Sequence, residues 1–326
     1  MLSRRTLTAL ILSAGALVAH DAAAQTKVLN LGFVGRQTAP EGISVTAMAE
    51  AVKQRTNGRV EIKLHPGGAL GGDREVIEGV TLGTVDMTVA STSIFANFVP
   101  DLQVFDIPFL FRDFDHAMGV LEGPVGQEMM AKINARGMKG LGFGGIGFRQ
   151  LTNSRRPVTG VEDVKGLKIR TQENQIHLQV WRALGALPTP MAIPEVFTAL
   201  QQGVVDGQEN PVGAIINNKF GQVQKYLTIS NHAFTPLALV VNPAAYAALS
   251  AGDKKVLDEE GLKAMRRTKD EVAKVEKTGV DELRGMGLQV VEKVDTAKFQ
   301  DMLKPTFADL AKRFGESTIN RIKDHK

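Results

Sequence analysis

The chain has 326 residues, of which 43% are hydrophobic, and this length can supply the cores of two α/β lobes or of one large one. Its formal net charge of only +4 is far below the basic footprint that a nucleic-acid partner requires, so none is expected. Cysteine is absent, which excludes thiol catalysis, thiolate metal sites and disulfide bonds, so stability must come from core burial.

The first 24 residues have the pattern of a secretory signal peptide. Arg4 and Arg5 precede an apolar run at residues 7–19, and three alanines at 22–24 offer a cleavage site. The apolar run is shorter than the roughly 20 residues that a membrane-spanning helix needs. We therefore expect a soluble, periplasmic protein that is not inserted in the membrane once the signal is removed. The paired arginines leave both the Sec and the twin-arginine export routes open.

The first part of the mature chain alternates between strand and helix patterns. Apolar runs and apolar–polar alternation predict strands at residues 28–33, 60–64 and 85–90. Helical spacing predicts a helix over 43–56 that stops at Asn57-Gly58, and a second helix that Asp73 caps and that ends near Gly83. This β-α-β order predicts a parallel sheet.

The rest of the chain continues the alternation and then becomes helical. Helical patterns occupy residues 116–136, 175–184 and 195–202, and strand patterns occupy residues 140–147, 167–170 and 204–206. From Ser250 onward the chain is strongly charged and helical, with a break at 285–287 and a strand over 288–291. The pattern as a whole predicts an α/β fold without internal repeats or a low-complexity linker.

Two motifs that could indicate a cofactor are better explained otherwise. Residues 142–147 read GFGGIG and match the dinucleotide-binding pattern G-x-G-x-x-G. That site needs a helix directly after the glycines to hold the pyrophosphate, whereas residues 148–152 are strand-like, which favours a glycine-rich strand or a hinge. The histidines lack the H-x-x-x-H and H-x-H spacings of metal sites, so neither a metal nor another cofactor is expected.

Arg170 ends the strand over 167–170, and a polar segment, VDGQENP, follows about forty residues later at 205–211. A guanidinium beside a polar loop suggests an anion site in a cleft. An arginine at a strand end also commonly pairs with a surface carboxylate or covers a helix end with its stem. The residues alone leave both interpretations open.

Three successive blocks of sequence closely resemble the solute-binding proteins of TRAP transporters, the DctP-type family. They are GLKIR at 166–170, ALPTPMA at 186–192 before EVFTALQ, and VDGQENP at 205–211. Four further blocks look like family blocks in the expected order: NGRVEI at 57–62, LGGDRE at 70–75, IPFLF at 107–111 and GFRQ at 147–150. The resemblance therefore covers nearly all of the mature chain.

This resemblance implies a two-lobed α/β fold of the periplasmic-binding-protein type II. Each lobe would be a mixed α/β domain built from discontinuous segments, joined by a hinge, with a long helix crossing both. By analogy, lobe I comprises residues 25–146 and 236–276, and lobe II comprises residues 147–235 and 277–326. The chain would cross between the lobes near Gly147, Pro236 and Lys277.

The resemblance also implies an anion site in the second lobe. In that family the arginine that matches Arg170 binds the substrate carboxylate, in keeping with the two-donor geometry of a guanidinium. Arg149 would be a second cation and Asn210 a neutral donor. Ile193, at a position that is often aromatic in relatives, would form an apolar wall.

The other end of the ligand would be contacted mainly from the first lobe. Asp73 and Ser91 match family positions that reach the polar end of the ligand, and Ser91 stands where some members carry a glutamate. Gln37 and Phe234 complete the set of candidate contacts.

The implied function is capture of a small carboxylate and its delivery to the membrane permease subunits of a TRAP transporter, without catalysis. The ligand could be a sugar acid, a hydroxy acid or a C4-dicarboxylate, and Asp73 favours the first two because it would repel a second carboxylate nearby. A ligand-sensing module of a membrane receptor would use the same residues. An exported hydrolase or lyase is a third alternative, although the sequence has no G-x-S-x-G motif.

Overall fold

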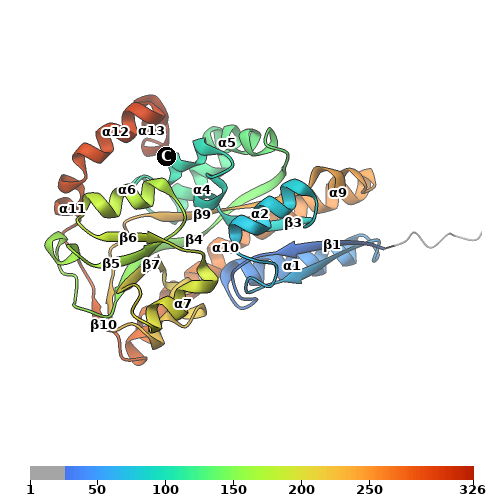
Figure 1. Ribbon diagram of the computed structural model, residues 1–326. Coiled ribbons are helices and arrows are strands. Elements are labelled where there is room, and N and C mark those ends of the chain that lie inside the picture. Colours follow the sequence, from blue (N-terminus) through green and yellow to red (C-terminus); the bar gives the residue numbers. More distant parts are fainter. Residues whose placement is uncertain (1–25) are drawn as a thin grey trace, which may run out of the picture.

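The computed structural model describes residues 26–326, so the predicted signal peptide lies outside the described residues (Figure 1). The first sheet begins with parallel strands, since β1 (Lys27–Gly32) pairs with β2 (Val60–His65) on one side and with β3 (Met87–Ser91) on the other. Helices α1 (Pro40–Arg55) and α2 (Asp73–Leu82) connect these strands. The elements predicted for this segment are confirmed, with ends shifted by a few residues.

The start of α2 differs from the prediction in one respect. Gly72 is the N-cap residue and makes no side-chain capping bond, whereas Asp73 is the first helical residue. The predicted capping role of Asp73 is therefore wrong, and its carboxyl group is available for another purpose. The helix ends at Gly83, whose φ of 81° is in the left-handed region that favours glycine at this position.

The strand β9 (Phe234–Val241) makes the sheet mixed rather than parallel. It lies between β3 and β4 (Lys139–Asn153) and runs antiparallel to both. The expectation of a purely parallel sheet is thus wrong, because sequence alternation does not reveal a strand that returns from a distant part of the chain. Residues 142–147 lie within β4, and the absence of a helix after them confirms that they are no dinucleotide-binding loop.

The strand β4 is 15 residues long and takes part in both halves of the molecule. Its first half pairs with β9, and its second half pairs with β7 (Gly207–Pro211) and β8 (Tyr226–Thr228). Its register with β9 shifts between Gly145 and Phe148, and Gly147 has a φ of 103°. The strand therefore changes course beside the first predicted crossing, and the assignment of lobe boundaries stays a prediction.

The second half is built on β5 (Lys168–Thr171), which runs parallel to β6 (Leu187–Pro190) and β7. Helices α6 (Gln175–Ala183) and α7 (Ile193–Gln201) connect these strands, and α8 (Val212–Asn217) follows β7. The strand predicted over 204–206 is wrong: those residues form a bend, and the strand begins at Gly207, in the segment predicted to be a loop. All five residues of β7 are buried although three of them are polar.

The helix α10 (Ala251–Gly285) crosses both halves of the molecule (Figure 1). Its 35 residues correspond to a length of about 50 Å. Met265 packs in the core of the first half and Leu283 in the core of the second, so one helix ties the two together. Among residues 26–326, no helix is both long and apolar enough to cross a membrane.

The remaining elements complete both halves. They are α3 (Thr92–Phe95), α4 (Phe114–Glu122), α5 (Pro124–Asn134), α9 (Pro243–Ala247), β10 (Gln289–Val291), α11 (Thr296–Met302), α12 (Lys304–Phe314), α13 (Glu316–Lys323) and three short 3-10 helices at Pro100–Asp106, Val161–Val164 and Phe220–Gln222. The single helix predicted over 116–136 is divided in two at Gly123, because Pro124 starts a new helix.

The end of the chain contacts the segment assigned to lobe I. Helix α13 packs against α5, and Arg321 pairs with Glu128 at 2.6 Å. Arg112 also donates hydrogen bonds to the carbonyl oxygens of Lys323 and His325. These contacts join the last helix to the first half, and its assignment to lobe II stays a prediction.

Candidate functional site

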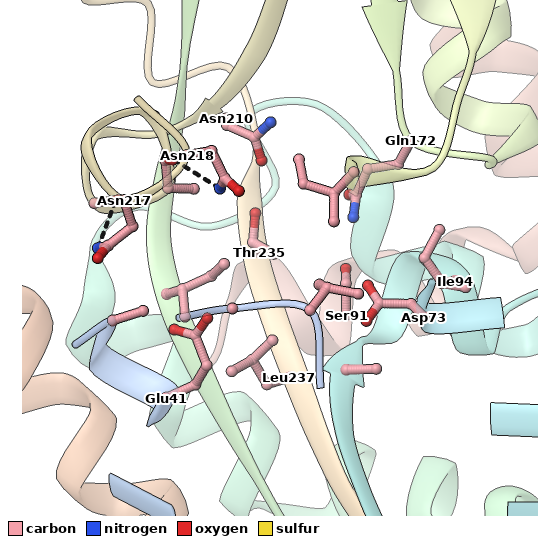
Figure 2. A pocket seen from close by; sticks show the side chains of 18 of the residues that line it. Glu41, Asp73, Ser91, Ile94, Gln172, Asn210, Asn217, Asn218, Thr235 and Leu237 are labelled. Atoms are coloured by element: carbon pink, nitrogen blue, oxygen red, sulfur yellow. Dashed lines mark hydrogen bonds between the residues drawn. The ribbon is translucent and has the colours of Figure 1, made fainter. Parts of the chain in front are cut away.

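A cavity of about 70 Å³ lies where β3 and β5 end and where α1 and α2 begin (Figure 2). Its lining includes Glu41 and Asp73 from the first turns of α1 and α2, Ser91 from β3, and Arg170 from β5. Parallel strands commonly present ligand sites at their carboxyl ends, where loops and helix N-termini converge. Both halves of the molecule thus contribute side chains to one enclosed site.

Arg170 is oriented so that one edge of its guanidinium remains available. Its side chain is buried, and its Nε and Nη2 groups donate to the Met191 carbonyl oxygen at 3.0 and 2.6 Å. Nη1 is buried and has no hydrogen-bond partner within residues 26–326. Burial and the nearby Arg149 charge lower the pKa of Arg170 to about 10, so it remains a cation at neutral pH. A buried cationic donor that faces a cavity is typical of an anion-binding site.

Arg149 lines the same cavity, but its charge is compensated within the protein. Its Nε donates to Glu209 Oε2, and its Nη2 donates to Glu209 Oε1 at 3.0 Å and to Asn210 Oδ1 at 3.2 Å. Burial opposes the ionisation of Glu209, yet Arg149 and His177 hold its pKa well below the usual range. Arg149 is thus a cation of the site whose charge is balanced by Glu209, and its contact with a ligand stays a prediction. Arg149 and Asn210 are joined in a hydrogen-bonded cluster beside Arg170.

Asp73 and Ser91 approach the cavity from the first half, as the resemblance implied. Asp73 Oδ1 is buried without a hydrogen-bond partner in the described part of the chain. Burial and the charge of Glu41 raise the pKa of Asp73 to about 7. Ser91 Oγ accepts a hydrogen bond from the Ser93 backbone N–H at 3.3 Å, which leaves the hydroxyl proton available for a ligand.

Ile193 also lines the cavity, with Met191 and Ala192, and its role as an apolar wall for the ligand stays a prediction. Phe234 and Gln37 do not belong to the lining. Phe234 packs against Phe114 with a ring separation of 5.0 Å, because alternation along β9 turns it away from the cavity and presents Thr235 instead. Gln37 is exposed, and its amide donates to Thr46 Oγ1 at 3.4 Å.

Several lining residues were not predicted. Glu41 is the second residue of α1, and burial raises its pKa to about 7 although its own backbone N–H opposes the shift. Gln172 has a buried Oε1 without a partner in the described residues, and Thr235 Oγ1 accepts a hydrogen bond from Arg149 Nη1 at 3.0 Å. A glutamate after Pro40 is typical of any helix N-terminus, so no local signal indicates that this one faces a ligand.

The two carboxyl groups predict how the stability of the ligand-free protein depends on pH. Folding raises their pKa values from 4.5 for Glu41 and 3.8 for Asp73 to about 7. Between these values the folded state binds more protons than the unfolded state, so the free energy of unfolding should fall as the pH rises and level off above about 7. Urea denaturation across this pH range should show the fall, and Glu41→Gln and Asp73→Asn should each reduce its slope. Equal slopes in both variants and the wild type would show that the carboxyl pKa values are ordinary.

Residues 31–313 match the family model described as bacterial extracellular solute-binding protein, family 7. The chain belongs to this family. It is 40% identical over 302 residues to a solute-binding protein of Verminephrobacter eiseniae, and the alignment covers 93% of this chain and 90% of that protein. Membership of an extracellular family places the mature protein in the periplasm, in agreement with the leader-like N-terminus.

Two solved structures show the same fold with acids assigned to their sites. A TRAP periplasmic solute-binding protein of a Polaromonas species, bound to D-erythronate, has a TM-score of 0.90 and 42% identity, with 92% of this chain and 99% of that chain covered. One of Bordetella bronchispeptica, with density assigned to pantoate, has a TM-score of 0.89 and 42% identity, with 93% and 100% covered. The protein is therefore a DctP-type solute-binding protein of the TRAP class, with the two-lobed type II fold.

Proposed function

We propose that the ligand of this solute-binding protein is a hydroxy acid or sugar acid, that Arg170 holds its carboxylate, and that the protein passes it unchanged to TRAP permease subunits. The observation that carries the site assignment is the unpartnered Nη1 of Arg170 in the cavity, within the described part of the chain. The Met191 carbonyl occupies the Nε–Nη2 edge, so the Nη1–Nη2 edge can make two parallel hydrogen bonds to a carboxylate. The acids in the two solved relatives, D-erythronate and pantoate, carry a carboxylate and hydroxyl groups, which supports the proposal.

One arginine is not enough for tight binding. Two charge-assisted hydrogen bonds contribute about 3 to 6 kcal/mol, whereas micromolar affinity needs about 8 kcal/mol after the costs of association. The remaining free energy must come from contacts with the first half, including Asp73 and Ser91, and from the removal of water when the lobes close. The site therefore requires both halves of the molecule.

A thermal-shift screen tests the proposed ligand class. D-erythronate, galactonate, a uronate, a 2-oxo acid and succinate would each be added to the purified protein, with the corresponding uncharged alcohols as controls. We expect a hydroxy or sugar acid to raise the melting temperature most, because ligand binding stabilises the folded state by mass action. If none of these acids raises the melting temperature, the proposal is wrong. Recovery of a chemically altered acid would instead support the alternative of an exported enzyme.

A further inference from the structure

Two arginines line the cavity, and among the described residues only Arg170 has a buried donor without a partner, beside groups that accept hydrogen bonds. Among the described residues, the unpartnered buried atoms that line it are Arg170 Nη1, which is a donor, and Asp73 Oδ1 and Gln172 Oε1, which are acceptors. Glu41 adds a second carboxyl group to the accepting side. A ligand that satisfies this arrangement brings one anionic group for Arg170 and hydrogen-bond donors for the remainder.

Glu41 is held in the cavity by the backbone beneath it. A Cβ atom at Gly35 would lie 1.8 Å from Glu41 Oε1, so the carboxyl group packs closely against this glycine, and any larger residue at position 35 would displace it. In Figure 2, Glu41 and Asp73 lie on opposite sides of the cavity with Leu237 between them. When ionised, both carboxylates repel a negative charge placed between them. The charge of Glu41 also raises the pKa of Asp73.

We propose that Glu41 acts with Asp73 as a charge filter that favours monocarboxylic hydroxy acids and excludes dicarboxylates. This inference rests on the proposed function and assigns to Glu41 a specificity role. The ligand carboxylate binds Arg170, and its hydroxyl groups donate to the two carboxyl groups. The second carboxylate of a dicarboxylate would meet these same groups without a cation to neutralise it, because Arg149 is already paired with Glu209.

The exclusion of dicarboxylates depends on whether Glu41 and Asp73 are protonated. The charged groups that line the cavity are Glu41 of α1, Asp73 of α2, Arg149 of β4, Arg170 of β5 and Glu173 of the following loop. Glu75 of α2 and Glu209 of β7 lie nearby and act on the pKa values of Asp73 and Arg170. A dicarboxylate can enter only if the carboxyl pair takes up a proton, so its affinity should rise as the pH falls from about 8 to about 6.5. The affinity for a hydroxy monocarboxylate should change less over the same range.

Isothermal titration with D-erythronate and succinate, which share a four-carbon chain, tests the filter. At about pH 8 we expect the wild-type protein to prefer D-erythronate by at least about 10-fold, and the Glu41→Gln/Asp73→Asn double variant to reduce this preference by at least about 10-fold. Glu41→Gln alone should reduce it in part. Glu50→Gln, an exposed change of equal charge on the same helix α1, should leave it unaltered.

The outcomes separate this inference from the proposed function. Binding of succinate more tightly than D-erythronate by the wild-type protein would overturn the filter and leave carboxylate capture intact. An unchanged preference in the double variant would do the same. If no acid in the panel binds, the proposed function fails and this inference fails with it. Circular dichroism and the melting temperature of each ligand-free variant would show that loss of binding is not loss of folding.

Discussion

Replacement of Arg170 by alanine should weaken the binding of the cognate acid by about two to four orders of magnitude. The variant loses two charge-assisted hydrogen bonds to the ligand carboxylate, which contribute about 3 to 6 kcal/mol, and each 1.4 kcal/mol corresponds to a tenfold change in affinity. The variant also loses the hydrogen bonds from Nε and Nη2 to the Met191 carbonyl oxygen, so the melting temperature of the ligand-free variant serves as the control for folding. Isothermal titration of the wild type and the variant measures the difference directly.

Two further variants make this result specific to the guanidinium. Arg170→Lys keeps the charge but loses the two-donor edge, so its affinity should lie between those of the wild type and of Arg170→Ala. Arg182→Ala removes an equal charge from an exposed position on helix α6 and should leave the affinity unchanged. If Arg170→Ala binds the acid as tightly as the wild type, the carboxylate lies elsewhere in the cavity.

The position of Arg170 could be anticipated because the information lies in local sequence. Its strand and the turn before α7 are compact blocks that resemble a known family, and the observed strand Lys168–Thr171 contains the predicted residue. The helices and strands of the first half are predictable for a similar reason. Helix α2 buries one face with a helical period, so its Val76, Ile77 and Val80 are recognisable without knowledge of their partners, whereas β3 is recognisable as a short apolar run that is buried throughout.

The strand β7 shows what local sequence cannot reveal. Gln208, Glu209 and Asn210 are polar, which predicts a loop, yet all three are buried. Their partners are distant in the chain: Gln208 Nε2 donates to Thr152 Oγ1 56 residues away, and Arg149 bonds to Asn210 61 residues away. Hydropathy cannot distinguish a solvated polar strand from one whose hydrogen bonds are satisfied by β4.

The same limitation explains why the sequence did not reveal the ion pair of Arg149 or the place of Glu41 in the site. The residues around Arg149 in the sequence include no partner for its charge. Its partner, Glu209, lies 60 residues later in the chain and is brought into contact only by the fold. Glu41 resembles any acidic residue in the first turn of a helix until Gly35 is seen beneath its carboxyl group. Charge compensation and enclosure are properties of tertiary structure, and both decide what the site can bind.

Substitution of Glu209 by glutamine should destabilise the ligand-free protein by about 3 to 5 kcal/mol. The Arg149–Glu209 pair is almost fully buried, with side-chain exposures of 1% and 0%. Removal of one partner from a buried ion pair leaves the other charge uncompensated in a medium of low polarity. Glu209 also accepts from His232 Nε2 at 3.0 Å and lies 3.4 Å from His177 Nδ1, so its loss affects three neighbours. Urea denaturation measures the change in the free energy of unfolding.

A surface pair provides the matched control for this prediction. Glu128→Gln breaks the Arg321–Glu128 pair, whose side chains are 42% and 52% exposed, and should cost less than about 1 kcal/mol. Equal losses of unfolding free energy in Glu209→Gln and Glu128→Gln would mean that water solvates the Arg149–Glu209 pair in the folded protein. The Arg149→Gln/Glu209→Gln double variant extends the test, because it removes the uncompensated charge. Its loss of stability should be smaller than the sum of the two single losses, since the two side chains act as one unit beside Arg170.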